Sequence, residues 1–338
     1  MISTGERAYS YAKACGIIGK SFVGKRIATL GGVSRLSELD RLVFPDESRD
    51  LPEKELLLDL EARITARAVK QILQIVDSFL KPPTLLSYLI RTYEYTDLKT
   101  ALKAIEVGDQ KPPAFTDIGH FRTVHFEAYP DLAAMVEGSE FGFLLKKRNM
   151  QNTGEANEHI MSIMLDRHYY ASLWNALLAL PPKDRVFTKK ILFEEISLRN
   201  VVWALRLRTY YGMTPEQTRE NLISLGNKKN LVADAEASLR MALDNRAGWN
   251  GYPRAHFLNP ETPNEPWTAD PRYFQNAASK YLYRLARLSF RRQPFSLDMV
   301  FCFIKLKLFE EDLLTSMAEG LVLGMSSHDV LSMLEVPA

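Results

Sequence analysis

Apolar residues recur at steps of three and four along most of this 338-residue sequence, and this spacing limits the possible fold more than any other feature. Between Lys54 and Phe79 they form one face of a long amphipathic helix. The residues of that face are Leu57, Leu60, Ile64, Ala68, Ile72, Ile75 and Phe79. The same period appears at 158–180 and 279–290, and no convincing run alternates apolar and polar residues between hairpin turns. The sequence therefore predicts an all-α protein.

Two segments of the sequence align without a gap at an offset of 112 residues, one starting at Asn200 and the other at Asp312. The matched pairs that follow are Gly212 with Gly324, Thr214 with Ser326, and Gln217 with Asp329. Glycine is favoured just past a helix end, and Ser or Thr caps the start of the next helix. A polar residue three positions after the cap can bond back to it, as in a capping box. Each copy is predicted to be a helix, a glycine stop and a capped helix.

A weaker third copy lies upstream, where Asp97 and Gly108 match Asn200 and Gly212 at offsets of 103 and 104. Copies roughly a hundred residues apart are too widely spaced for a solenoid with a period near 35 residues. The repeat instead predicts three similar helical domains, which we place at residues 1–117, 118–228 and 229–338.

Segments rich in proline, glycine and charged residues interrupt the helical pattern at 44–52, 107–119 and 225–230. The longest irregular stretch, 248–271, contains five prolines and two tryptophans. We expect it to be an ordered surface loop, because its aromatic side chains need a surface on which to pack.

Composition and charge exclude several classes of function. The net charge of +2 argues against strong nucleic-acid affinity. The two cysteines, Cys15 and Cys302, are far apart and predict no disulfide framework and no zinc site, so a reducing compartment is expected. The N-terminus lacks the apolar core of a signal peptide, and no stretch reaches about 18 apolar residues. Any membrane association is therefore expected to depend on a partner.

The stretch ACGIIGKS (14–21) satisfies a loose form of the phosphate-loop pattern. A phosphate loop needs a buried strand before it and a helix after it, so that backbone N–H groups surround the phosphates. The residues before this stretch are polar and helix-like, and those after it form no clear long helix. We therefore expect no nucleotide site, but a helix that loosens at Gly16 and Gly19. No other cofactor site is predicted.

Acidic pairs occur twice after a phenylalanine, at Glu194 and Glu195 and at Glu310 and Glu311. Two carboxylate clusters on helices could hold Mg²⁺ in an all-α enzyme, although neither has the aspartate-rich spacing of such sites. Convergence of the two clusters in one cavity would support this alternative.

Several weak motifs, in order and along essentially the whole chain, resemble one family, the C-type subunits of V-type (A-type) rotary ATPases and the d-type subunits of their eukaryotic counterparts. The stretches that carry the resemblance are AYSYAKA (8–14), LKTALKAI (98–105), LDRHYYASLW (165–174), ISLRNVVWALRLRTYYGM (196–213) and the segment 294–325. Asp97 and Asp312 stand where the family often has Asn.

The resemblance implies three similar helical domains that form a pseudo-threefold funnel without catalytic residues. Proteins of this family lie on the cytoplasmic face of the membrane proteolipid (c/K) ring and receive the central-shaft (D/F type) subunits. They thereby pass torque between ATP turnover and proton or sodium transport. Under this hypothesis we expect Arg206 and Arg208 to face a partner. A generic helical scaffold with unrelated partners remains the other alternative to the metal-dependent enzyme.

Overall fold

The computed structural model describes residues 2–148, 155–225 and 229–334, and these residues form helices and turns without a strand. The prediction of an all-α fold is confirmed. The α-helices are α1 (Thr4–Lys20), α2 (Leu36–Val43), α3 (Glu53–Val76), α4 (Thr84–Ile90), α5 (Thr92–Glu106), α6 (Leu132–Met135), α7 (Phe143–Arg148), α8 (Glu155–Leu178), α9 (Val186–Tyr211), α10 (Pro215–Glu220), α11 (Ala233–Leu239), α12 (Pro271–Phe290), α13 (Leu297–Val322) and α14 (Ser327–Met333).

The chain divides into two compact units. Unit 1 comprises Met1–Gln71 together with Pro181–Ala338, and unit 2 comprises Ile72–Leu180. The three domains expected at 1–117, 118–228 and 229–338, and their funnel arrangement, stay predictions.

The long amphipathic helix expected between Lys54 and Phe79 corresponds to α3. The apolar face predicted from the spacing is largely the buried face, because Leu60, Ile64 and Ala68 are all at most 3% exposed. Side chains three or four residues apart share one face of a helix, so burying this stripe removes most of its apolar surface from water.

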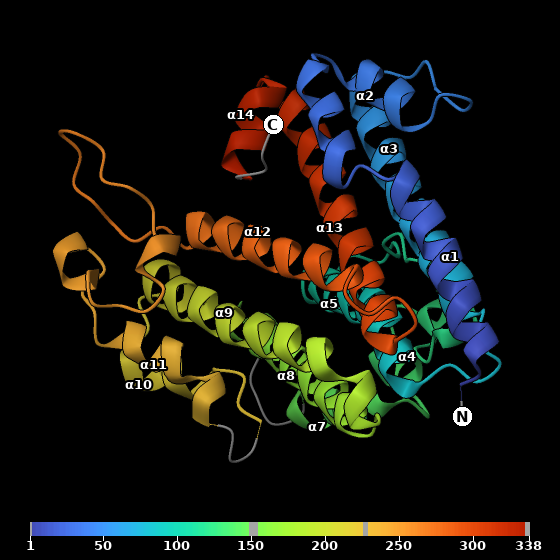
Figure 1. Cartoon of the computed structure of the whole chain (residues 1–338). Helices are drawn as coiled ribbons and strands as arrows, with labels where there is room; N and C mark the ends of the chain where they lie inside the picture. The colour runs from blue at the N-terminus through green and yellow to red at the C-terminus, as the bar shows by residue number, and fades with distance from the viewer. Residues whose placement is uncertain (1, 149–154, 226–228, 335–338) are drawn as a thin grey trace. The chain divides into compact units, whose positions relative to one another are not determined.

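Unit 1 is built around α12, which packs against both α9 and α13, while α11 packs against α9 (Figure 1). Polar side chains cap the starts of α12 and α13. Asp270 accepts a bond from the backbone N–H of Arg272 at the start of α12, and Ser296 accepts one from Met299 at the start of α13. These caps satisfy N–H groups that lack a partner within the helix.

The irregular stretch at 248–271 is ordered, as expected, and its aromatic residues enter the core of unit 1. Trp249 is fully buried and donates from its indole N–H to the carbonyl of Ala242 at 2.8 Å. Trp267 donates to the carbonyl of Asn259 at 3.0 Å. Both rings lie in one apolar cluster with residues of α9, α11 and α12. The stretch therefore serves as part of the core of unit 1.

The far end of α13 approaches α14 very closely. A Cβ atom added at Gly320 would lie 2.4 Å from Cγ2 of Val330. The absence of a side chain at this position is therefore what allows the two helices to pack at this distance.

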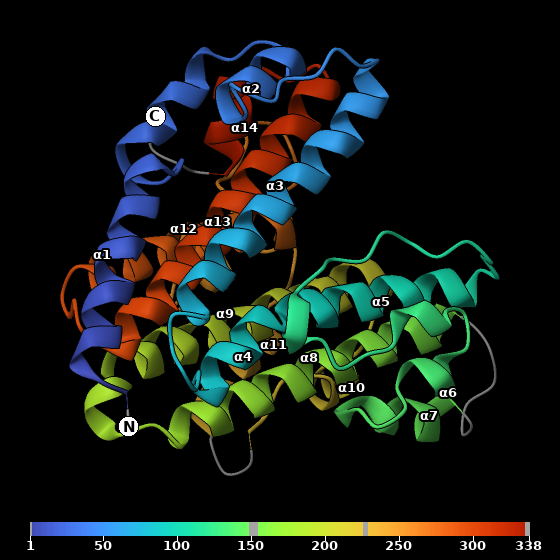
Figure 2. The same cartoon turned by 90° about the vertical axis from the view of Figure 1, so that its right-hand side faces the viewer.

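Unit 2 has α8 packed along both α4 and α5 (Figure 2). Fully buried leucines support this arrangement, among them Leu86 on α4, Leu98 on α5 and Leu173 on α8. The remaining irregular segments of unit 2 are attached to these helices by the polar contacts described below.

Candidate functional site

The three glycines of the predicted repeat lie at helix ends in the left-handed conformation. Gly108 follows α5 with φ +75°, Gly212 ends α9 with φ +59°, and Gly324 follows α13 with φ +78°. Residues with a Cβ are strained in this region, whereas glycine is not. The glycine stop predicted for each copy is therefore present in all three.

The helix that follows the stop is capped in two copies. Thr214 accepts a bond from the N–H of Gln217 and donates its own N–H to the Gln217 side chain at 3.0 Å, which completes a capping box. Ser326 accepts from the N–H of Asp329, but the Asp329 carboxylate bonds to the Ser326 hydroxyl at 2.6 Å. The expectation that Asp329 bonds to the backbone of its cap was wrong, because its side chain is one methylene shorter than glutamine.

In the first two copies, the opening residue forms a buried connection between a helix and the chain segment that follows it. On α5, Asp97 accepts bonds from the backbone N–H of Thr116 at 2.7 Å and from its hydroxyl at 3.3 Å. Burial raises the pKa of Asp97 to about 6.

On α9, Asn200 makes the corresponding connection with more bonds. Its Oδ1 accepts from the N–H of Ile223 at 2.7 Å, and its Nδ2 donates to the carbonyls of Ile223 and Leu231 at 2.9 and 3.0 Å. Asp312 on α13 is exposed, and the residue 23 positions after it, the counterpart of Ile223, lies outside the described residues. Sequence comparison identified these positions as repeat markers but did not reveal this bonding role.

The two arginines expected to face a partner make contacts inside unit 1. Arg208 donates to the carbonyl of Ser238, in the last turn of α11, at 3.0 Å and to that of Met241, just after the helix, at 2.8 Å. Burial lowers the pKa of its guanidinium. Arg206 donates to the Gln275 side chain on α12 at 2.6 Å. Arg208 thus satisfies carbonyls at a helix end, as cations near such ends do. A partner-binding role for either arginine stays a prediction.

The first acidic pair lies between basic side chains of unit 1. Glu194 forms an ion pair with Arg254 at 3.0 Å, and Arg254 also pairs with Asp234 at 2.8 Å. Glu195 pairs with Lys305 on α13 at 2.8 Å. These contacts connect α9 to the 248–271 stretch and to α13.

The second acidic pair is also occupied. Glu310 is 2% exposed, pairs with the buried Lys307, and accepts a bond from the N–H of Phe22 at 2.6 Å. Glu311 accepts a bond from the Thr65 hydroxyl at 2.7 Å. Among the side chains that the structure describes, no group of three or more His, Cys, Asp or Glu is placed to hold a metal ion. The four glutamates therefore connect separate segments of unit 1.

The stretch ACGIIGKS lies on α1, which continues through it to Lys20. The expected loosening at Gly16 and Gly19 was wrong, since the helix is continuous across both. Ser21 ends the helix, and its hydroxyl donates back to the carbonyl of Ile17 at 2.9 Å. Backbone N–H groups inside a continuous helix are already bonded, so the stretch offers no cradle for phosphate.

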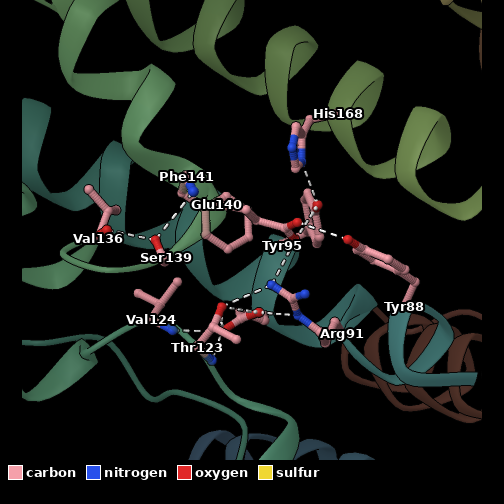
Figure 3. Close-up of polar contacts among 11 residues, drawn as sticks. Tyr88, Arg91, Tyr95, Thr123, Val124, Val136, Ser139, Glu140, Phe141 and His168 are labelled. Carbon is pink, nitrogen blue, oxygen red and sulfur yellow. Dashed lines mark hydrogen bonds and ion pairs between the residues drawn. The ribbon is translucent and has the colours of Figure 1, made fainter. Parts of the chain in front are cut away.

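Unit 2 contains a buried polar network centred on Arg91 (Figure 3). Arg91 pairs with Glu94 at 2.8 Å and with Glu140 at 2.7 Å. Glu94 also accepts bonds from the N–H groups of Thr123 and Val124. The network thus attaches the segments around 123 and 140 to the start of α5.

Tyrosine and histidine side chains extend this network to α8. The hydroxyl of Tyr95 lies 2.7 Å from Nδ1 of His168, and the hydroxyl of Tyr88 donates to Glu140 at 2.9 Å (Figure 3). Burial lowers the pKa of His168, which favours the neutral ring. A half-satisfied polar network would destabilise a core, but the charged groups here are paired, so the arrangement rigidifies unit 2. Sequence reasoning missed the network, although Arg91 and Glu94 show the i, i+3 spacing of a helical ion pair.

Among the described helices, none is both long enough and apolar enough to cross a membrane.

Comparison with known proteins assigns the family. Residues 47–333 match the model of the ATP synthase (C/AC39) subunit family. An uncharacterized protein of Treponema pallidum (strain Nichols) is 27% identical over 321 residues, which cover 94% of this chain and 92% of that protein. The match runs through the repeat, the 248–271 stretch and both acidic pairs, and the chain therefore belongs to the ATP synthase (C/AC39) subunit family.

Proposed function

We propose that this protein is the non-catalytic central-stalk adaptor of a V-type rotary ATPase or ATP synthase. In this role it links the shaft subunits (D/F type) to the proteolipid (c/K) ring on the cytoplasmic face of the membrane. It passes torque between them during proton or sodium transport. The observation that carries the proposal is the family match over residues 47–333.

The internal construction supports a mechanical role. A torque-transmitting joint must be stiff, because a compliant one would store the torque that it should pass on. Long helices with buried cores, glycine stops and capped turns resist local unfolding. The buried hydrogen bonds of Asp97 and Asn200 hold each helix to the segment that follows it. Glu194 and Glu195 add ion pairs that connect α9 to the 248–271 stretch and to α13.

The proposal predicts co-purification with the rotor. A tagged chain expressed in its source organism is captured from detergent-solubilised membranes, and the recovered proteins are identified by mass. We expect proteolipid and shaft subunits at stoichiometric yield, and neither from untagged membranes. Capture of a clean chain without these partners would contradict the adaptor role and favour a scaffold with other partners.

A further inference from the structure

Unit 1 has an apolar pocket of about 570 Å³ whose walls come from α1, from the link that follows it, and from the end of α12. Apolar side chains form its floor, namely Tyr11, Ile18, Val23, Phe290 and Leu306. This volume falls within the range of pockets that take a ligand or a large anchoring side chain.

The wall formed by the link is held by specific bonds. Phe22 donates its N–H to Glu310, and Gly24 donates its N–H to the hydroxyl of Tyr283 at 3.0 Å. Gly24 has φ +69°, and a Cβ there would lie 3.6 Å from the guanidinium of Arg287. The bonds from Phe22 and Gly24 fix the path of the chain after α1, so the pocket is preformed.

Four cations line this pocket and no carboxylate does: Lys25, Arg26, Arg287 and Arg291. Arg26 donates to the carbonyl of Lys20 and lies over the ring of Phe22, 4.4 Å from its centre. Within the described residues, none of the four forms an ion pair with an acidic side chain. Elsewhere in unit 1 the half-buried Arg254 pairs with Glu194 and Asp234. Lys25, Arg287 and Arg291 are exposed and Arg26 is half-buried, so the cluster presents a positive surface to a partner.

Helix dipoles do not account for the cluster. The C-terminal ends of α1 and α12 both lie at this pocket, and cations there are favoured. Each helix end carries roughly half a negative charge, so two ends offset only about one of four cations. About three positive charges remain beside an apolar floor.

We infer that this pocket docks an acidic segment of a neighbouring protein of the complex. The segment would place one aliphatic or aromatic side chain on the floor and its carboxylates against the four cations. Complementary charge favours encounter and register, while the buried anchor supplies affinity. The inference rests on the proposed function, because it takes the partner from the same rotary complex.

The native cysteines allow the pocket to be probed in the assembled complex. Cys15 lines the pocket and is partly exposed, whereas Cys302 is fully buried, so a maleimide reacts with the native chain at Cys15. We expect Cys15 to react about tenfold or more slowly in the purified complex than in the isolated chain, because reagent access follows exposure. Equal rates in the complex and in the isolated chain would overturn the inference.

Cross-linking identifies the occupant. Tyr11 is replaced by photoreactive p-benzoylphenylalanine, which keeps an aromatic ring at the pocket, and the complex is irradiated. We expect a cross-link to a segment rich in Asp and Glu in another protein of the complex. A cross-link to a lipid, to a basic or neutral segment, or to no molecule would overturn the inference.

Charge reversal tests the contribution of the cations that line the pocket. The double variant Arg287→Glu/Arg291→Glu is expected to lower the recovery of partner subunits about tenfold at moderate salt. The control Lys189→Glu/Lys190→Glu makes the same charge change on exposed positions of α9 and is expected to retain them. The variant Arg287→Gln/Arg291→Gln separates lost docking from misfolding. It is expected to show an intermediate loss of partner recovery with unchanged helical circular dichroism. Equal recovery of partner subunits with the pocket variant and the control variant would overturn the inference while leaving the adaptor role intact.

Discussion

At the scale of single residues, the difference between Asp97 and Asn200 follows from what each side chain meets. Asp97 meets only donors, the N–H and hydroxyl of Thr116, and a carboxylate can accept both. Asn200 meets one N–H and two carbonyls, so it needs an amide that accepts and donates. An aspartate at position 97 can therefore make the same kind of connection as the asparagine at position 200.

Replacing Asn200 should expose the cost of this connection. Asn200→Ala leaves three buried backbone groups of Ile223 and Leu231 without their partner, each costing about 1 kcal/mol or more. We expect the free energy of unfolding, measured with urea, to fall by about 3 kcal/mol. The control Asn221→Ala removes one bond within a single helical turn and should change it by less than about 1 kcal/mol. Similar small losses in both variants would show that the connection is not important.

The raised pKa of Asp97 predicts a specific pH dependence. Its folded-state pKa is about 6, against an ordinary value of 3.8, because of burial. The folded state therefore holds the proton more tightly, and stability present at low pH is lost as pH rises through this window. Relative to Asp97→Asn, which cannot titrate, the wild type should lose on the order of 2 kcal/mol between pH 4 and 7. If urea unfolding gave the wild type and Asp97→Asn parallel curves of stability against pH, this prediction would be contradicted.

At the scale of elements, the same substitution should have opposite effects at two glycines. Gly212 ends α9 at φ +59°, so Gly212→Ala should destabilise by about 1 kcal/mol. Gly16 lies inside α1 with no atom within 4 Å of an added Cβ, so Gly16→Ala should stabilise by about 0.5–1 kcal/mol. Thermal unfolding measures both, and the same sign for the two would refute the assignment of Gly212 as a helix stop.

At the scale of the whole molecule, two compact units predict two unfolding transitions in calorimetry. Arg91→Met leaves Glu94 and Glu140 unpaired in unit 2, and should lower one transition by about 10 °C or more. The matched variant Arg254→Met leaves Glu194 and Asp234 unpaired in unit 1 and should lower the other. A single transition that moves equally in both variants would show that the two units unfold together.

Local features of this protein were determined by the sequence itself. Helix periods, the glycine stops at Gly212 and Gly324 and the cap at Thr214 depend on residues a few positions apart, where backbone sterics and short-range bonds decide. Features that depend on long-range contacts were decided only by the tertiary structure. They are the ion pairs of Glu195 with Lys305 and of Arg91 with Glu140, and the four cations that line one apolar pocket. No local pattern encodes such pairings, because they depend on which distant helices come to lie side by side.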